Sequence, residues 1–341
     1  MTHHTKSRIQ HPKYTVARVE VPDNRVDWSQ PFDNYIDRRP FYMHPEVERN
    51  LALEKTDSKR WAEAPTISLN DKELLKTRIT YINGTAQTLE EANIIFDGDN
   101  APVNPKGRTG IYGPGLLGKN GPNQAADPIF TRWAPFNVRP FIYAILNLMN
   151  LFIHGPMMVD IIELVWQIIC GFFLMCPHLE MIAIQRWDTR DLAIPGGMVE
   201  AGQTVSKTLR NELYEEAFNK NPDNTYIIAI DKILSEGRMI YIGYVDDPRN
   251  TDSRWMETTA VHFHCPAKIA NKINLEAGDD ARKAIWLPMN PFDMRYKKLY
   301  ASHKQITDRL IIQVYTSTCV YNIIVFMASY IFVNELLEYF M

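Results

Sequence analysis

The chain has 341 residues, of which 45% are hydrophobic and 23% charged, so it has room for two domains with sizeable cores. Its net charge of −3 gives no reason to expect nucleic acid as a partner, because nucleic-acid binders need a basic stripe. The four cysteines have no metal-ligand spacing, which indicates free thiols in a reducing compartment.

Residues 1–133 are rich in Pro, Asn, Asp and Gly, with only short apolar runs. This composition predicts a small, loop-rich N-terminal domain, whose Pro- and Gly-dense part from Pro102 to Pro128 is expected to form one wall of a cleft. Residues 1–14 are basic and free of acids but lack an apolar core, so they do not form a secretory signal. We expect a cytoplasmic protein, or a mitochondrial one if this stretch is a short presequence.

After residue 178 the pattern changes to alternating strands and helices, which predicts an α/β domain over residues 179–310. Met181–Ile184 is predicted to be a strand, and the chain then reaches a glycine turn at Gly196-Gly197. The helix after that turn is predicted over Val205–Phe218. Further predicted strands are Tyr226–Ile233, Met239–Val245, Val261–His264 and Ala284–Leu287, the last preceding a C-terminal helix.

Two apolar segments interrupt this plan: an insertion over residues 134–178 and a tail over residues 311–341. The two arms of the insertion would each reach only roughly 22 Å against a hydrocarbon core of about 30 Å, which argues against a double crossing. Residues 311–333 carry no charge and are long enough to span a membrane, so membrane attachment there is one hypothesis. A buried C-terminal helix is the second. The third hypothesis covers both segments and holds that they are translated intron sequence.

The turn at Gly196-Gly197 leads into a helix that carries Glu212, Glu215 and Glu216. At about 100° per residue, Glu212 and Glu216 lie about 40° apart, so the carboxylates converge on one edge of the helix. They repel one another, and of the three only Glu216 has an oppositely charged residue four places away, Lys220. A divalent cation would relieve this repulsion, and oxygen ligands beside a phosphate substrate favour Mg²⁺ or Mn²⁺. The alternative is a solvated acidic helix face.

The stretch Gly197-x5-Gln203-x7-Asn211-Glu212-Leu213-x-Glu215-Glu216 resembles the Nudix box, Gly-x5-Glu-x7-Arg-Glu-(apolar)-x-Glu-Glu. Gln203 stands where the family has Glu, and Asn211 where it has the Arg that braces the carboxylates. Arg210 is adjacent, but a rotation of about 100° prevents it from taking over that role.

The remaining motifs resemble the eukaryotic ADP-ribose pyrophosphatase branch of that family, whose relatives include the ADP-ribose-sensing tail of a cation channel. The resemblance runs from about residue 14 to about residue 310. It is carried by Gly107-Arg108-Thr109-Gly110, Ala125-Ala126-Asp127-Pro128, Thr131-Arg132-Trp133, Gly243–Asp252, Glu276–Asp280 and Tyr300–His303. It implies an α/β/α sandwich with a mixed sheet, preceded by the smaller N-terminal domain.

The resemblance implies hydrolysis of the ADP-ribose pyrophosphate to AMP and ribose 5-phosphate by a monomer. Glu212, Glu216 and Gly197 would hold Mg²⁺, and water would attack phosphorus in line. Glu215 is one candidate for the general base, and Glu276, Asp279 or Asp280 is another. The alternative function is a module that senses ADP-ribose without cleaving it, which the departures at Gln203 and Asn211 favour.

Six residues are expected to bind substrate: Arg108, Arg132, Asp127, Gly197, Asp279 and Asp280. A guanidinium offers a rigid fork of donors to phosphate, although a single Arg is more often a surface residue. The Glu276–Asp280 cluster has an alternative interpretation as an acidic surface turn. Asp246-Asp247-Pro248 has one as a turn that ends a strand.

Overall fold

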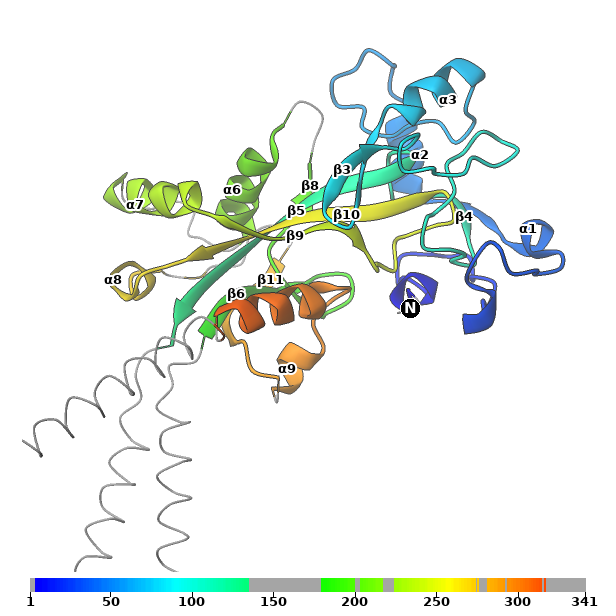
Figure 1. Ribbon diagram of the computed structural model, residues 1–341. Coiled ribbons are helices and arrows are strands. Elements are labelled where there is room, and N and C mark those ends of the chain that lie inside the picture. Colours follow the sequence, from blue (N-terminus) through cyan, green and yellow to red (C-terminus); the bar gives the residue numbers. More distant parts are fainter. Residues whose placement is uncertain are drawn as a thin grey trace, which may run out of the picture.

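The computed structural model describes residues 4–134, 179–199, 203–216, 224–273, 275, 281–291, 293–314 and 316. Its centre is a seven-stranded sheet with the order β11-β6-β5-β10-β9, in which β7 pairs with β6 and β8 with β5 (Figure 1). Strands β5 and β10 are parallel and the other pairs are antiparallel. The predicted mixed sheet is therefore confirmed. The strands are β5 (Gly121–Trp133), β6 (Leu179–Arg186), β7 (Leu192–Ala193), β8 (Gly197–Met198), β9 (Arg238–Val245), β10 (Arg254–His264) and β11 (Ala281–Pro288).

Both faces of the sheet are covered by helices. Ile182 of β6 belongs to a core shared with Leu209 and Leu213 of α6 (Val205–Glu216), beside which lies α7 (Asn224–Ser235). The adjacent Met181 faces the other way, into a core shared with Ile306 of the helix over residues 303–314. This alternation along one strand places α6 and α7 above the sheet in Figure 1 and the C-terminal helix with α9 (Met294–Lys297) below it. The α/β/α sandwich is confirmed.

The N-terminal part is built from short elements and long connections, as its composition predicts. It contains two small sheets, β1 with β4 and β2 with β3. Its elements are η1 (Lys6–Arg8), η2 (Asp23–Arg25), α1 (Tyr35–Arg38), β1 (Phe41–Met43), α2 (Pro45–Leu51), α3 (Leu69–Lys76), β2 (Ile79–Ile82), β3 (Thr85–Thr88) and β4 (Tyr112–Gly115). A further short helix, α8 (Ala267–Ala270), follows the main sheet's β10.

Strand β5 joins the two parts of the chain. The sequence places residues up to 133 in the N-terminal domain, yet β5 pairs with β10 from Gly121 to Thr131 and lies inside the main sheet. Buried Asp252, just before β10, accepts hydrogen bonds from the N-terminal part: from the backbone and hydroxyl of Thr109, from Tyr35 and from Arg39. The N-terminal part is thus tied directly to the loop between β9 and β10.

One predicted strand is wrong: Tyr226–Ile233 lies within helix α7. Its run of isoleucines favours a strand locally, but burial follows a helical spacing, with Ile230 and Ile233 buried and Ile228 exposed. Asp231 of the same helix also pairs with Arg210 of α6. The other predicted strands lie in β6, β9, β10 and β11, and the predicted helix from Val205 matches α6.

The two apolar segments fall almost wholly outside the described residues, so the three hypotheses about them stay predictions. Among the described residues, no helix combines the length and the apolar character needed to cross a membrane.

Candidate active site

The glycine turn predicted from the sequence packs against the middle of β5. Gly197 in β8 pairs with Ala126, and α6 follows the turn and packs on β5. A Cβ atom at Gly197 would lie 2.1 Å from Oε1 of Glu212, and one at Gly196 would lie 2.2 Å from Oδ1 of Asp127. The turn therefore holds two carboxylates against its backbone, one on each glycine, and a larger residue at either position would displace them.

Glu212 of helix α6 lies next to the buried face of the helix. Leu209 and Leu213 are buried, Glu212 is half-buried against the turn and Glu215 is exposed. Glu216 is the last residue of α6, and its side chain lies outside the described part of the chain. Within that part no three metal-binding side chains cluster. The Glu212 carboxylate beside a peptide backbone without a Cβ nonetheless offers the hard oxygen donors that Mg²⁺ or Mn²⁺ requires.

The structure shows contacts of Arg210, the neighbour of Asn211, and of Gln203, one of the two departures from the Nudix box. Arg210 does not face Glu212: its Nε donates to Oδ1 of Asp231 over 2.7 Å and its Nη2 to Oδ2 over 3.2 Å. This pair draws the guanidinium toward α7, as the rotation of one residue predicts. Gln203 lies within 3.4 Å of the hydroxyl of Thr208, which donates to its side-chain oxygen.

A small cavity of about 50 Å³ opens beside the glycine turn. Two guanidinium–carboxylate pairs stand around it. Arg249 donates from Nε and Nη2 to Asp247 over 2.9 and 2.8 Å, and Arg186 donates in the same way to Asp188 over 2.9 and 2.7 Å. The lining includes Asp127, Arg186, Gly197, Asp247, Arg249 and Tyr300.

Tyr300 connects the two pairs. Its hydroxyl donates to Oδ1 of Asp247 over 3.2 Å, and the guanidinium of Arg186 lies 4.3 Å from the centre of its ring. Burial by itself raises the pKa of Asp247, but the charge and hydrogen bonds of Arg249 outweigh it and hold that pKa well below its usual value. Burial also lowers the pKa of nearby His303 to about 3, so this imidazole is neutral at physiological pH. The site therefore contains charged groups, Arg249, Asp247 and Arg186, whose positions are fixed by hydrogen bonds.

These pairs are the part of the site that the sequence interpretation missed. Asp247 and Arg249 lie in a stretch that resembles the ADP-ribose pyrophosphatase branch, but the sequence gives neither a role in the site and leaves a turn as an alternative for Asp246-Asp247-Pro248. The sequence signal for this pair is the spacing of two residues between Asp247 and Arg249. At that spacing a short loop allows the guanidinium to donate two hydrogen bonds to the carboxylate. Arg186 and Tyr300 meet only through the fold.

The predicted substrate residues are only partly brought together. Asp127 and Gly197 meet at the cavity, whereas Asp279 and Asp280 lie outside the described residues. Arg132 stands farther along β5, where its Nε donates to Glu180 over 2.8 Å and its guanidinium stacks 4.0 Å from the ring centre of Trp286.

Arg108 binds the protein's own backbone. Its guanidinium donates to the backbone carbonyls of Arg25, Asp27, Trp28 and Gln30, and so holds the loop over residues 25–30 in place. Substrate contacts by Arg108 and Arg132 stay predictions, and the structure gives both side chains other partners.

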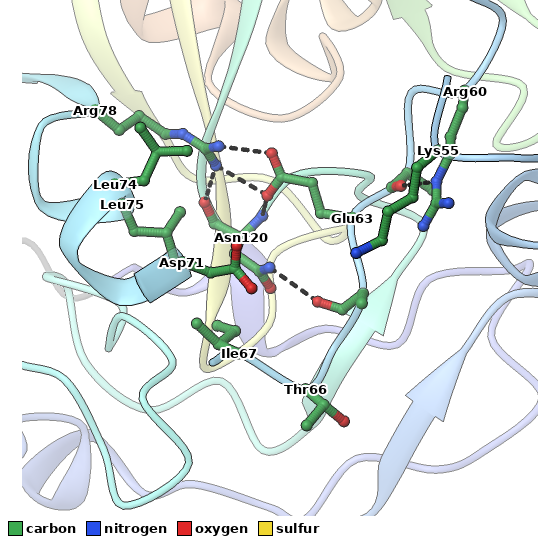
Figure 2. A pocket seen from close by; sticks show the side chains of 12 residues that line it. Lys55, Arg60, Glu63, Thr66, Ile67, Asp71, Leu74, Leu75, Arg78 and Asn120 are labelled. Atoms are coloured by element: carbon green, nitrogen blue, oxygen red, sulfur yellow. Dashed lines mark hydrogen bonds and ion pairs between the residues drawn. The ribbon is translucent and has the colours of Figure 1, made fainter. Parts of the chain in front are cut away.

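A larger cavity, about 280 Å³, lies in the N-terminal part and contains none of the predicted site residues. Figure 2 shows Arg78 and Glu63 facing each other there, with Asn120 between them. Arg78 donates to both carboxylate oxygens of Glu63 and to the carbonyl of Asn120. We place the active site at the smaller cavity, because it is lined by the glycine turn.

The buried carboxyl of Asp127 gives a test by pH. Burial raises its pKa from 3.8 to about 6, although Thr258 donates to it over 2.7 Å. Because the folded pKa is raised, the stabilisation is complete below about pH 4 and is lost as the pH rises through 6. Roughly two pKa units correspond to about 3 kcal/mol.

We therefore expect the unfolding free energy of the wild type, minus that of Asp127→Asn, to fall by about 3 kcal/mol between pH 4 and pH 7. Urea titrations at several pH values measure this difference. The buried histidines titrate in the opposite direction, and the subtraction removes their contribution. Parallel pH profiles for the two proteins would show that Asp127 does not titrate as described.

Comparison with known proteins identifies the family. Residues 21–121 match the family described as NUDT9-like, N-terminal domain. Over 297 residues the chain is 35% identical to putative nudix hydrolase 6 of Caenorhabditis elegans, covering 86% of this chain and 90% of that protein. Over 310 residues it is 35% identical to the mitochondrial ADP-ribose pyrophosphatase of Rattus norvegicus, covering 89% and 76%.

A channel protein is similar as well. The chain is 37% identical over 317 residues to a transient receptor potential cation channel subfamily M member-like 2 protein of Nematostella vectensis, covering 90% of this chain but only 17% of the channel. A solved MutT/nudix family protein from Enterococcus faecalis aligns with a TM-score of 0.34 and 14% identity, over 58% of this chain and 64% of that one. The two hydrolases, similar over most of both lengths, show that this chain belongs to the Nudix hydrolase family, in its ADP-ribose pyrophosphatase branch.

Proposed function

We propose that the protein hydrolyses the pyrophosphate bond of ADP-ribose, giving AMP and ribose 5-phosphate. The observation that carries this proposal is the pair of carboxylates, Asp127 and Glu212, held against Gly196 and Gly197 beside a cavity with two guanidinium groups. The name of the rat relative supports ADP-ribose as the substrate. The same name makes a mitochondrial location one proposal, with the cytoplasm as the other.

Glu212, Glu216 and the backbone carbonyl of Gly197 would hold the divalent ion, Mg²⁺ or Mn²⁺. Bound there, the ion would supply positive charge next to the phosphoryl oxygens, where negative charge develops. The absence of a Cβ at Gly197 is what lets the Glu212 carboxylate approach the backbone closely enough to share a ligand.

The chain's own residues bind and orient the substrate in this proposal. Arg249 and Arg186 each use two N–H groups on a carboxylate, and their remaining donors are available to phosphate or ribose oxygens. The pairing keeps both guanidinium planes fixed before substrate arrives, which lowers the ordering cost of binding. Glu215 is exposed and remains one candidate base, alongside Glu276, Asp279 and Asp280.

A sensor that binds ADP-ribose without cleaving it is the second candidate. Two observations favour it: the similarity to a channel protein, and Arg210 being engaged by Asp231 while Asn211 occupies the position of the bracing Arg. The intact Glu212-Leu213 pair favours the enzyme. We propose hydrolysis as the main activity.

The metal-binding assignment is tested by Glu212→Gln and Glu216→Gln. Each change removes a charge that the ion needs, so AMP release from ADP-ribose with Mg²⁺ should fall by about 100-fold or more while nucleotide affinity is retained. Glu236→Gln is the matched control, because Glu236 is an exposed residue after α7. Chromatography quantifies the AMP. Tight binding by the wild type without any AMP would favour the sensor over the enzyme.

Because Asn211 stands where the family has the bracing Arg, we expect that restoring this Arg raises activity. Asn211→Arg restores the family's Arg next to the carboxylates, and outer contacts of this kind change metal affinity or activity by about 10-fold or more. We expect turnover to rise by that order. Arg210→Ala is the control and should change turnover less than about twofold, because Arg210 faces Asp231. The interpretation of the box fails if Arg210→Ala reduces turnover as strongly as Glu212→Gln.

A further inference from the structure

The first residues of the chain lie across the loop between β9 and β10, which carries Asp247 and Arg249 into the active site (Figure 1). We call residues 4–18 the N-terminal segment and residues 246–250 the site loop. No sequence motif marks the segment as part of the site. Its hydrogen bonds nonetheless converge on the loop from residues more than 200 positions away.

The segment fixes the loop just before the Asp247–Arg249 pair. The carboxylate of Asp246 accepts the backbone N–H of Lys6 over 2.9 Å and that of Ser7 over 2.6 Å. It also accepts the hydroxyl of Ser7 over 2.7 Å. Three donors from two consecutive residues leave this carboxylate little freedom to move.

The segment also fixes the loop at and after the pair. The hydroxyl of Tyr14 donates to the carbonyl of Arg249 over 2.7 Å. Nη2 of Arg18 donates to the carbonyls of Pro248 over 2.5 Å and Asn250 over 3.0 Å. Every one of these contacts is to loop backbone, so they constrain the path of the chain rather than the chemistry of a side chain.

A third contact reaches the tyrosine between the two guanidinium groups. The ammonium of Lys6 donates to the carbonyls of Leu299 and Ala301, the residues on either side of Tyr300. In the same segment, Nε2 of fully buried His11 lies 3.7 Å from Oδ2 of Asp188, the partner of Arg186. The segment therefore contacts the surroundings of Arg249, Tyr300 and Arg186.

We infer that Ser7, Tyr14 and Arg18 are positioning residues for substrate binding. Ser7 holds the Asp246 side chain, Tyr14 and Arg18 hold the backbone of the site loop, and together they make Arg249 meet its ligand in one orientation. This inference rests on the proposed function for its substrate. Displacement of a binding group by about 1 Å can cost on the order of 100-fold in rate or affinity. Arg249 binds rather than reacts, so a loosened loop raises KM and leaves kcat nearly unchanged.

Two tyrosines provide a matched test. Tyr14 and Tyr42 are both buried in one aromatic cluster, with ring centres 4.9 Å apart. Each donates its hydroxyl to a backbone carbonyl, Tyr14 to Arg249 in the site loop and Tyr42 to Lys13 in the segment itself. Tyr14→Phe and Tyr42→Phe thus each remove one hydroxyl from this cluster, and only the first releases the loop. The Tyr14 hydroxyl also accepts the backbone N–H of Leu116 over 3.3 Å, outside the loop.

In the full-length protein, we expect Tyr14→Phe to raise KM for ADP-ribose by about 10-fold with kcat within about threefold of wild type. Arg18→Met should do the same, with partial rescue by Arg18→Lys. Tyr42→Phe should leave both parameters within about twofold, although it also loses a hydrogen bond and with it some thermal stability. Equal KM values for the two Phe variants, with an active wild type, would overturn the inference.

The same comparison separates this inference from the proposed function. If the wild type releases no AMP, hydrolysis is wrong, and the dissociation constant for ADP-ribose measured by calorimetry replaces KM. A weaker affinity in Tyr14→Phe than in Tyr42→Phe then supports the positioning role, and equal affinities refute it.

Discussion

The close approach of two carboxylates to the Gly196-Gly197 backbone is the contact that determines the geometry of the candidate site. Asp127 comes from β5 and Glu212 from α6, and both reach the turn because neither glycine has a Cβ. The pairing of β8 with β5 and the packing of Leu209 and Leu213 of α6 on the sheet bring them there. The packing of the core thus also sets the positions of the two carboxylates, and a change in that packing would move them.

The guanidinium groups of the site are held in place in a different way. Arg249 is held by the buried carboxylate of Asp247 and Arg186 by the half-buried carboxylate of Asp188. The backbone around Arg249 is held by the N-terminal segment. Asp252 adds a second tie, from the N-terminal part to the residues before β10. The N-terminal part therefore supports the binding side of the cavity, whereas the glycine turn and α6 supply the carboxylate side.

The sequence predicts the glycine turn and helix α6 because both are local features. Glycine, helix periodicity and the spacing of Glu212, Glu215 and Glu216 all lie within about one turn and one helix. The binding side of the cavity depends on contacts between distant residues. Arg108 looks like a phosphate ligand, yet its donors go to carbonyls about 80 positions earlier, and no local pattern records that. The strand predicted over Tyr226–Ile233 is a helix for a related reason. Its conformation is set by burial against α6 and the sheet, which the local content of isoleucine does not reveal.

The most direct test adds one methyl group to the turn. Gly197→Ala places a Cβ where Oε1 of Glu212 lies, whereas Gly98→Ala adds the same group in an exposed turn with no atom within 4 Å. AMP release from ADP-ribose with Mg²⁺ should fall by about 100-fold in a folded Gly197→Ala protein and be unchanged in Gly98→Ala. Full activity in Gly197→Ala would contradict the placement of the active site at this turn.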